Sequence, residues 1–254
     1  MARVTPAPAP AHPPATDPVV VVAGGTGLVG SAVVAALRAR GTRVVVPTRR
    51  NTRHDDAPRS PADDGVRTVQ VTSWEDPHEL RAVLAEPGWH PGAAVAAIGG
   101  WWLGPELVAL DPATWRGLVE SHLTGHFLVV RALAPLLTGP DPAYVLLNGA
   151  AATEPMAGSG PVSVTGAAQR MLLEVLRAET LGARVRFHEV DVTVSVAGDE
   201  RNLDPAHTVP VEQVAAAVVD VLDRPASPAV VPVAPRADVR ATDPARHGRP
   251  DVRP

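Results

Sequence analysis

The feature that most constrains the fold is the glycine-rich turn Ala23–Gly30, AGGTGLVG, which directly follows the apolar run Val19–Val22. A continuous apolar run predicts a strand buried on both faces, and a helical pattern follows from Leu28 to Arg40. Glycines here permit a sharp turn, a close backbone approach to a phosphate and tight packing of helix on strand, while the helix dipole faces the anion. A purely structural turn is the competing interpretation. The favoured one is a dinucleotide pyrophosphate site formed by Gly24, Thr26, Gly27, Leu28 and Gly30.

The segment after the second expected strand, Thr42–Val46, indicates which dinucleotide would bind. It reads Pro47-Thr48-Arg49-Arg50, and no acidic residue occurs before Asp55. An acid at this point accepts hydrogen bonds from the ribose of NAD, whereas arginine accommodates the 2′-phosphate of NADP. Arg49 and Arg50 therefore predict NADP(H), although solvated loop charges are the alternative.

Short β-branched runs alternate with helical patterns along the rest of the chain, which is typical of βαβ units. We expect an α/β fold, a single doubly wound Rossmann domain over residues 19–235, with a mostly parallel central sheet of about seven strands. Residues 1–18 are rich in proline and alanine, and residues 236–254 lack periodicity, so both are expected to be disordered. The further expected elements are strands at 68–72, 93–98, 144–147, 185–190 and 229–233, and helices at 77–84, 111–137 (broken near Pro135), 166–181 and 211–222.

Composition excludes several kinds of chemistry. The chain contains no cysteine and no lysine, so all 23 basic residues are arginine, and Tyr144 is its single tyrosine. Thiolate catalysis, Schiff-base chemistry and a Tyr-Lys catalytic pair are therefore impossible. The net charge of −4 does not favour nucleic-acid binding, and no signal peptide or membrane span is expected, so the predicted location is the cytoplasm.

Several segments resemble the short-chain dehydrogenase/reductase superfamily from about Val19 to Val233. Trp115–Leu137 resembles its long fourth helix, Val145–Ala152 the strand and turn that present the catalytic serine, and Ser163–Glu179 the following helix. The resemblance implies an NADP(H)-dependent oxidoreductase that pairs its two long helices in a homodimer or homotetramer. It also implies a serine at Ala150 or Ala151, a tyrosine at Val162 and a lysine at Gly166. None of those residue types is present at these positions, which indicates an atypical member.

The remaining candidates for the site surround the missing residues. His122 stands where the resemblance implies an asparagine near the nicotinamide, and a histidine can donate a proton at neutral pH; a packing histidine is the alternative. His126 lies one helical turn further on, but no third ligand is identifiable, so no metal site is expected. Gly99 follows the fourth expected strand and is predicted to contact the cofactor. Trp101 and Trp102 come next and are predicted to stack on a flat substrate, unless they only pack beneath the loop.

Three functions remain open. The first is a ketoreductase-like NADP(H)-dependent oxidoreductase of a bulky aromatic or polyketide-like carbonyl, with a non-standard route for the proton. The second is a catalytically inactive NADP(H) sensor or regulatory protein. The third is a non-redox isomerase or cyclase. The expected partners are a small-molecule substrate and further copies of the chain, with neither nucleic acid nor a membrane.

Overall fold

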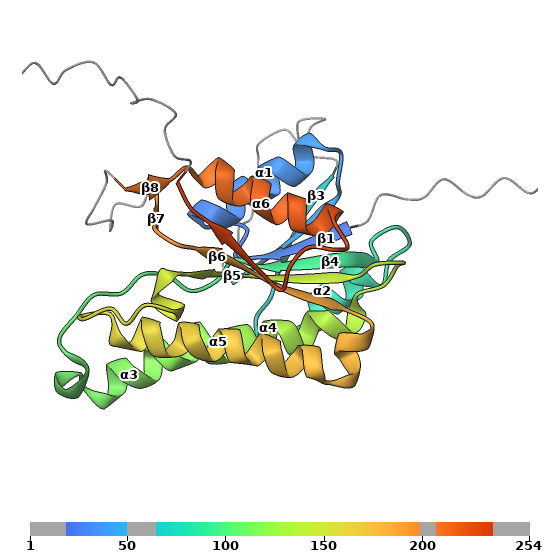
Figure 1. Cartoon of the computed structure of the whole chain (residues 1–254). Helices are drawn as coiled ribbons and strands as arrows, with labels where there is room; N and C mark the ends of the chain where they lie inside the picture. The colour runs from blue at the N-terminus through green and yellow to red at the C-terminus, as the bar shows by residue number, and fades with distance from the viewer. Residues whose placement is uncertain (1–18, 50–64, 199–206, 236–254) are drawn as a thin grey trace, which may run out of the picture.

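The computed structural model describes residues 19–49, 65–198 and 207–235, and within them seven strands form one parallel sheet in the order β3-β2-β1-β4-β5-β6-β9 (Figure 1). This confirms the predicted doubly wound α/β fold. Two short strands, β7 and β8, form a separate parallel pair that was not predicted. The strands are β1 (Val19–Ala23), β2 (Val44–Thr48), β3 (Val66–Gln70), β4 (Pro91–Ala96), β5 (Ala143–Gly149), β6 (Arg186–Val192), β7 (Ser195–Val196), β8 (Thr208–Val209) and β9 (Val230–Val233).

Helices cover both faces of the large sheet. On one face lie α1 (Leu28–Ala39) and α6 (Val211–Asp223), which pack against each other (Figure 1). On the other face lie α2 (His78–Leu84), α4 (Gly125–Leu133) and α5 (Gly160–Ala178), and α3 (Pro112–Val119) extends this layer beyond the sheet. None of the helices in the described ranges is long and apolar enough to cross a membrane.

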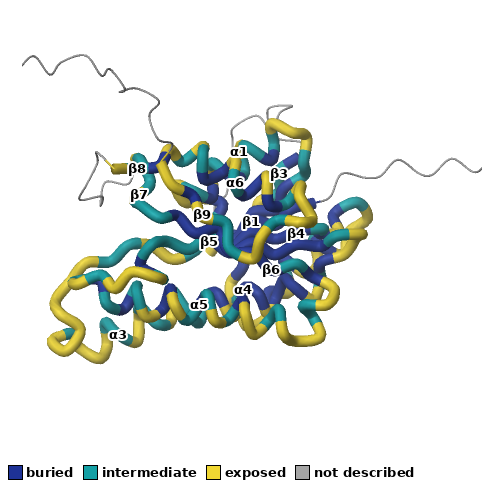
Figure 2. Tube along the Cα trace, in the orientation of Figure 1, coloured by how far each residue is buried: buried dark blue, intermediate teal, exposed yellow. Residues whose placement is uncertain are grey.

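The central strands are buried on both faces, as their apolar runs predict (Figure 2). In β1, Val19 and Val21 join the hydrophobic core beneath α4 and α5, whereas Val20 and Val22 join the core beneath α1 and α6. Side chains that alternate between two apolar layers make β1 the middle of the molecule. The sheet therefore gives a rigid support to the loops at its carboxyl edge.

The expected long helix over residues 111–137 is not one regular helix. Asp111 caps its start, because Oδ1 accepts hydrogen bonds from the backbone amides of Ala113 at 3.0 Å and Thr114 at 2.9 Å. The α3 helix then gives way to a π-helical turn, Glu120–Thr124, before α4 begins, and a 3₁₀ turn at Ala134–Leu136 ends the segment where Pro135 predicted a break. An extra residue in a helical turn displaces the side chains that follow it, and such turns are frequent at functional sites.

Other boundaries differ from the predictions by a few residues. The α5 helix starts at Gly160 rather than Gly166, because Pro161 occupies its first turn, where a missing amide hydrogen costs no hydrogen bond. The second strand extends to Thr48, two residues beyond the predicted end. The expected disorder at 1–18 and 236–254 lies outside the described residues.

Candidate functional site

The glycine-rich turn leaves no room for side chains at its two tightest points. Gly24 has a φ of +82°, and a Cβ there would overlap the carbonyl oxygen of Ala97 after β4. A Cβ at Gly30 would overlap the carbonyl oxygen of Gly24, so α1 starts in contact with the turn. A Cβ at Gly27 would meet only the carbonyl oxygen of Gly24 at 3.4 Å, so its outer side is open. The turn thus exposes backbone at Gly27 and packs closely at Gly24 and Gly30.

A cavity of about 660 Å³ lies at the carboxyl edge of the sheet, where the strand order reverses between β1 and β4. In open α/β sheets this crevice is where ligands bind. Segments far apart in the sequence form its wall: Gly27–Gly30, Ala97–Trp101, His122, Leu147–Ala151, Glu154, Met156, Val162, Thr165, Gly166, Gln169, Val192–Val196 and His207. We call the part at Gly27–Gly30 the nucleotide end, and the part at Ala150, Ala151, Glu154, Met156 and Val162 the substrate end.

Only some of the predicted cofactor residues line this cavity. Leu28 and Gly99 line it with Gly27 and Gly30, whereas Gly24 and Thr26 do not. Arg49 follows the buried end of β2 and is exposed beyond the cavity wall. Arg50 lies outside the described residues. An acid is absent from the described end of β2, so nothing there opposes a 2′-phosphate.

The two predicted substrate tryptophans lie differently. Trp101 lines the cavity, but Trp102 does not. The indole of Trp102 covers Gly104. The backbone carbonyl oxygen of Trp102 accepts a hydrogen bond of 2.7 Å from the buried hydroxyl of Ser159. Trp102 therefore packs beneath the loop and ties it to the segment before α5, which was the alternative considered for one of the pair.

His122 lies in the π-helical turn and on the cavity wall. Its Nε2 donates to the carbonyl oxygen of Gly100 at 2.7 Å, and its Nδ1 lies 2.9 Å from the hydroxyl of Ser121. Nδ1 also lies 3.1 Å from the carbonyl oxygen of Leu118, so it either accepts from the serine hydroxyl or donates to this carbonyl oxygen. Proton donation to a substrate would require Nε2 to leave the carbonyl oxygen of Gly100.

His126 is buried one turn further along and does not face the cavity. Its Nε2 donates to the carbonyl oxygen of Ile98 at 3.2 Å, and burial lowers its pKa to about 4. The ring is therefore neutral at pH 7, and with His122 it holds the two ends of the loop around Gly99, whose φ is +104°. No group of three metal-ligating side chains occurs within the described ranges.

The positions that the resemblance assigns to serine, tyrosine and lysine all lie on the cavity wall, as Ala150, Ala151, Val162 and Gly166. The chain's tyrosine cannot replace the missing one. Tyr144 lies in β5, completely buried in the hydrophobic core, and its hydroxyl has no partner among the described residues. The substrate end thus has an apolar surface where the resemblance implies a proton donor.

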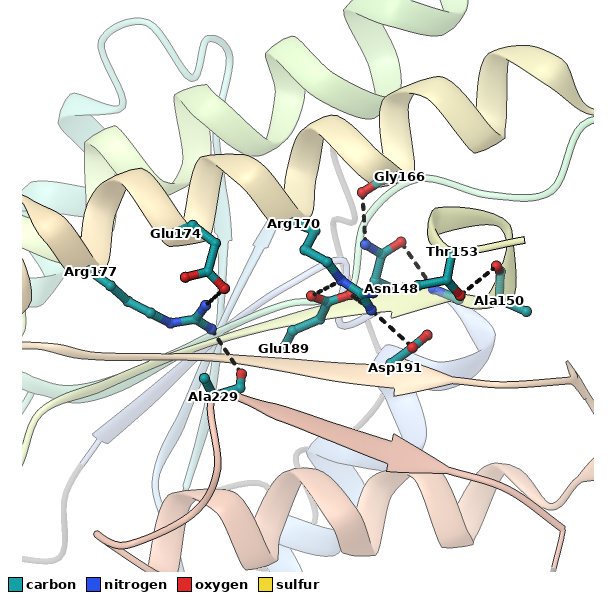
Figure 3. Close-up of polar contacts among 11 residues, drawn as sticks. Asn148, Ala150, Thr153, Gly166, Arg170, Glu174, Arg177, Glu189, Asp191 and Ala229 are labelled. Atoms are coloured by element: carbon teal, nitrogen blue, oxygen red, sulfur yellow. Dashed lines mark hydrogen bonds and ion pairs between the residues drawn. The ribbon is translucent and has the colours of Figure 1, made fainter. Parts of the chain in front are cut away.

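The space beside Gly166 is filled by neighbouring atoms. A Cβ there would lie 3.2 Å from Cα and Cβ of Ala152 and from Oδ1 of Asn148, which is tighter than ordinary van der Waals contact. Asn148 Nδ2 also donates to the carbonyl oxygen of Gly166 at 3.0 Å (Figure 3). A longer side chain at this position would therefore have to displace the wall.

Two polar residues of the wall were not singled out from the sequence. The amide of Gln169 is buried and donates from Nε2 to the carbonyl oxygen of His122 at 2.8 Å, which binds α5 to the π-helical turn. Glu154 follows β5 and is exposed at the substrate end. Neither belongs to a local pattern, because each acquires its role only when distant segments meet.

A charged cluster lies behind the wall (Figure 3). Arg170 on α5 donates to both oxygens of Glu189 at 2.8 Å and to Oδ2 of Asp191 at 3.0 Å. The side chain of Glu189 is 0% exposed and that of Asp191 10%, and these bonds raise the pKa of Arg170. The cluster contains one more carboxylate than guanidinium groups.

Comparison with known proteins agrees with this geometry. Residues 20–106 match the model of the NAD dependent epimerase/dehydratase family. No curated protein sequence matches the chain. The chain is similar to a short chain dehydrogenase from Burkholderia cenocepacia solved in complex with NADP, with a TM-score of 0.71 and 23% identity over 87% of this chain and 90% of that one.

Two further solved structures are similar. One is a short-chain type dehydrogenase/reductase from Mycobacterium ulcerans, with a TM-score of 0.70 and 21% identity over 85% of this chain and 87% of that one. The other is a metagenomic short-chain oxidoreductase in complex with NADP, with a TM-score of 0.68 and 20% identity over 87% and 98%. The chain therefore has the Rossmann fold of the short-chain dehydrogenases/reductases.

Proposed function

We propose that the chain is an NADP(H)-dependent oxidoreductase, similar to ketoreductases, that acts on a bulky aromatic or polyketide-like carbonyl compound. The observation that carries the proposal is the glycine turn, which is closed to any Cβ at Gly24 and Gly30 and opens at Gly27 onto a large cavity. A cavity of about 660 Å³ lies in the range expected for small-molecule sites. Trp101 and the apolar side chains of the substrate end favour a substrate with a flat apolar part.

The residues present fit the proposed cofactor. The backbone at Gly27 and the start of α1 would hold the pyrophosphate, and Arg49 with Arg50 would hold the 2′-phosphate. Bound NADPH would supply the hydride for a carbonyl carbon. Two of the structures described above were solved with NADP, which supports this choice.

Calorimetry with NADPH and NADH tests the cofactor. We expect NADPH to bind more tightly, and a double Arg49→Ala, Arg50→Ala variant to lose affinity for NADPH while its affinity for NADH changes little. Arg116→Ala, on the exposed surface of α3, is the matched control and should change neither affinity. Equal affinities for the two nucleotides in the unaltered protein would refute the choice of NADP(H).

We propose that His122 contributes the proton, since among the described wall residues only His122, Glu154 and His207 have ionisable side chains. Its Nε2 must exchange the carbonyl oxygen of Gly100 for the substrate oxygen, and the ring must carry a proton on both nitrogens before it gives one up, so we expect a moderate contribution to the rate. His122→Ala should lower kcat for a reduced ketone by about ten- to a hundredfold. An unchanged kcat with intact NADPH binding would transfer the role to water or to the substrate.

An NADP(H) sensor is the second candidate, because Ala150, Val162 and Gly166 give the substrate end no proton donor at the positions that the resemblance implies. Steady NADPH consumption with a panel of aromatic ketones and quinones distinguishes the two. Tight NADPH binding without oxidation across that panel would favour the sensor. Product formation without net oxidation would instead indicate an isomerase or cyclase.

We also propose that the chain forms a homodimer or homotetramer through the helices of the α3–α5 layer. Large apolar side chains are exposed there, at Phe127 on α4 and at Val164, Met171 and Val175 on α5. Helical spacing places Val164, Met171 and Val175 on one face of α5. Sedimentation at micromolar concentration should show a dimer or tetramer, and Met171→Glu should shift it towards monomer; a monomer in the unaltered protein would refute the proposal.

A further inference from the structure

We propose that the substrate end selects by charge: it accepts a carbonyl compound that carries a protonated amine and disfavours one that carries a carboxylate or phosphate. This inference rests on the proposed function, because it names the substrate class of the same cavity.

Glu154 is the first observation. Its side chain lies on the wall of a largely apolar cavity, between the end of β5 and the start of α5. Across the described residues, no ion pair or side-chain hydrogen bond involves this carboxylate. An unpaired carboxylate beside apolar surface attracts a cation and repels an anion.

The charged cluster behind the wall is the second, independent observation. Asp191 precedes Val192 and pairs in register with Asn148, and both of these neighbours line the cavity. One guanidinium at Arg170 faces the two carboxylates of Glu189 and Asp191, and Oδ1 of Asp191 has no partner among the described residues. The excess negative charge lies in a buried setting, where water screens it less than at the surface.

The wall offers an anion no arginine or lysine side chain, and the only described wall residues that can become cations are His122 and His207. Among its described residues none is an arginine, and the chain has no lysine. Both ring nitrogens of His122 already have partners within the chain, because Nε2 donates to the carbonyl oxygen of Gly100 and Nδ1 lies beside Ser121 and Leu118. Carboxylate and phosphate groups are normally bound by arginine or by backbone amides. The substrate end therefore favours a neutral or cationic substrate over an anionic one, and most of all a protonated amine.

The test measures binding of three acetophenones to protein saturated with NADP⁺, so no turnover is needed. The probes carry a dimethylaminomethyl, a methoxymethyl or a carboxymethyl group at the para position, and calorimetry gives the dissociation constants. We expect the amine to bind most tightly and the carboxylate most weakly. Their dissociation constants should differ by about tenfold, of which Glu154 contributes about two- to fivefold and the charged cluster behind the wall the rest.

Glu154→Gln should reduce the ratio between amine and carboxylate by about two- to fivefold. Glu106→Gln is the matched control, because Glu106 is an exposed acid that does not line the cavity, and it should leave the ratio unchanged. A carboxylate that binds as tightly as the amine, a ratio that Glu154→Gln does not change, or no binding of any probe overturns the proposal.

The same probes separate this inference from the proposed function. If the three bind in the expected order but none oxidises NADPH, the charge selection holds and the reductase is refuted. If all three are reduced with equal kcat/KM, the reductase holds and the charge selection is refuted.

Discussion

The nucleotide end and the substrate end of the cavity are built in different ways. At the nucleotide end, Gly27 and Gly30 contribute backbone to the surface, and neighbouring backbone excludes any side chain at Gly30 and at Gly24 beneath it in the turn. At the substrate end, side chains form the surface, and those of Ala150, Ala151 and Val162 are small and apolar. A site made of backbone tolerates few changes, whereas a site made of side chains can lose its chemistry while the fold remains. Substitutions can therefore test the two ends of the cavity separately.

The largest effect should come from adding one methyl group at the nucleotide end. In Gly30→Ala the new Cβ overlaps the carbonyl oxygen of Gly24, so α1 must move away from the turn. We expect NADPH binding to disappear in calorimetry and the protein to lose about 1–3 kcal/mol of stability. Gly41→Ala is the control, because Gly41 has a φ of +81° with nothing within 4 Å of a Cβ. It should cost about 1–2 kcal/mol through backbone strain and leave NADPH binding intact.

His126, which holds the loop around Gly99, should make the fold sensitive to acid. His126 holds this loop, and burial lowers its pKa to about 4, against about 6.5 in the unfolded chain. Between these two values the unfolded chain takes up a proton that the folded one does not. The stabilisation is complete above pH 6.5 and is lost as the pH falls towards 4, by about 3 kcal/mol in all.

Urea unfolding at several pH values measures this loss. His126→Gln should flatten the dependence, because glutamine does not titrate in this range and can still donate to Ile98. His78→Gln, on an exposed side chain, should leave it unchanged. An equally steep profile in the His126 variant would assign the acid sensitivity to other groups.

Attempts to restore the missing lysine at the substrate end should destabilise the protein rather than activate it. A side chain at Gly166 pushes on Ala152 and on Asn148, whose amide also bonds to the carbonyl oxygen of Gly166. We expect Gly166→Lys to cost about 1–3 kcal/mol in thermal unfolding, and the pair Val162→Tyr, Gly166→Lys not to raise NADPH consumption. Gly117→Lys, in open space on α3, should instead be neutral or slightly stabilising. A gain of activity in the double variant would show that the wall adapts.

The smallest effect on stability should come from a substitution at Tyr144, in the hydrophobic core outside both ends of the cavity. The hydroxyl of Tyr144 is buried without a partner, and burial raises its pKa. Tyr144→Phe removes that unsatisfied group at nearly constant volume, so the variant should gain about 1 kcal/mol, or about 2–4 °C in Tm. NADPH affinity and kcat should not change. A fall in kcat with the fold intact would indicate that Tyr144 reaches the site after all.

The sequence predicted the nucleotide end better than the substrate end, for a physical reason. The turn at residues 23–30 is local, so strand, glycines and helix follow from neighbouring residues, and the parallel sheet follows from their repetition. The π-helical turn depends on Gln169, 47 residues from His122, and the closure of Gly166 depends on Asn148 and Ala152. Trp101 and Trp102 are adjacent in the chain, yet only Trp101 lines the cavity. Local patterns do not contain such contacts.

The closed position at Gly166 has a consequence for how such a protein can change over generations. If an ancestor carried a lysine there, its loss allowed Ala152 and Asn148 to occupy the space, and a single reverse substitution now meets a filled wall. A lysine at this position would require Ala152 and Asn148 to move at the same time. A return to lysine by a single substitution is then unfavourable, whereas changes that suit another use of the cavity are not affected by this contact.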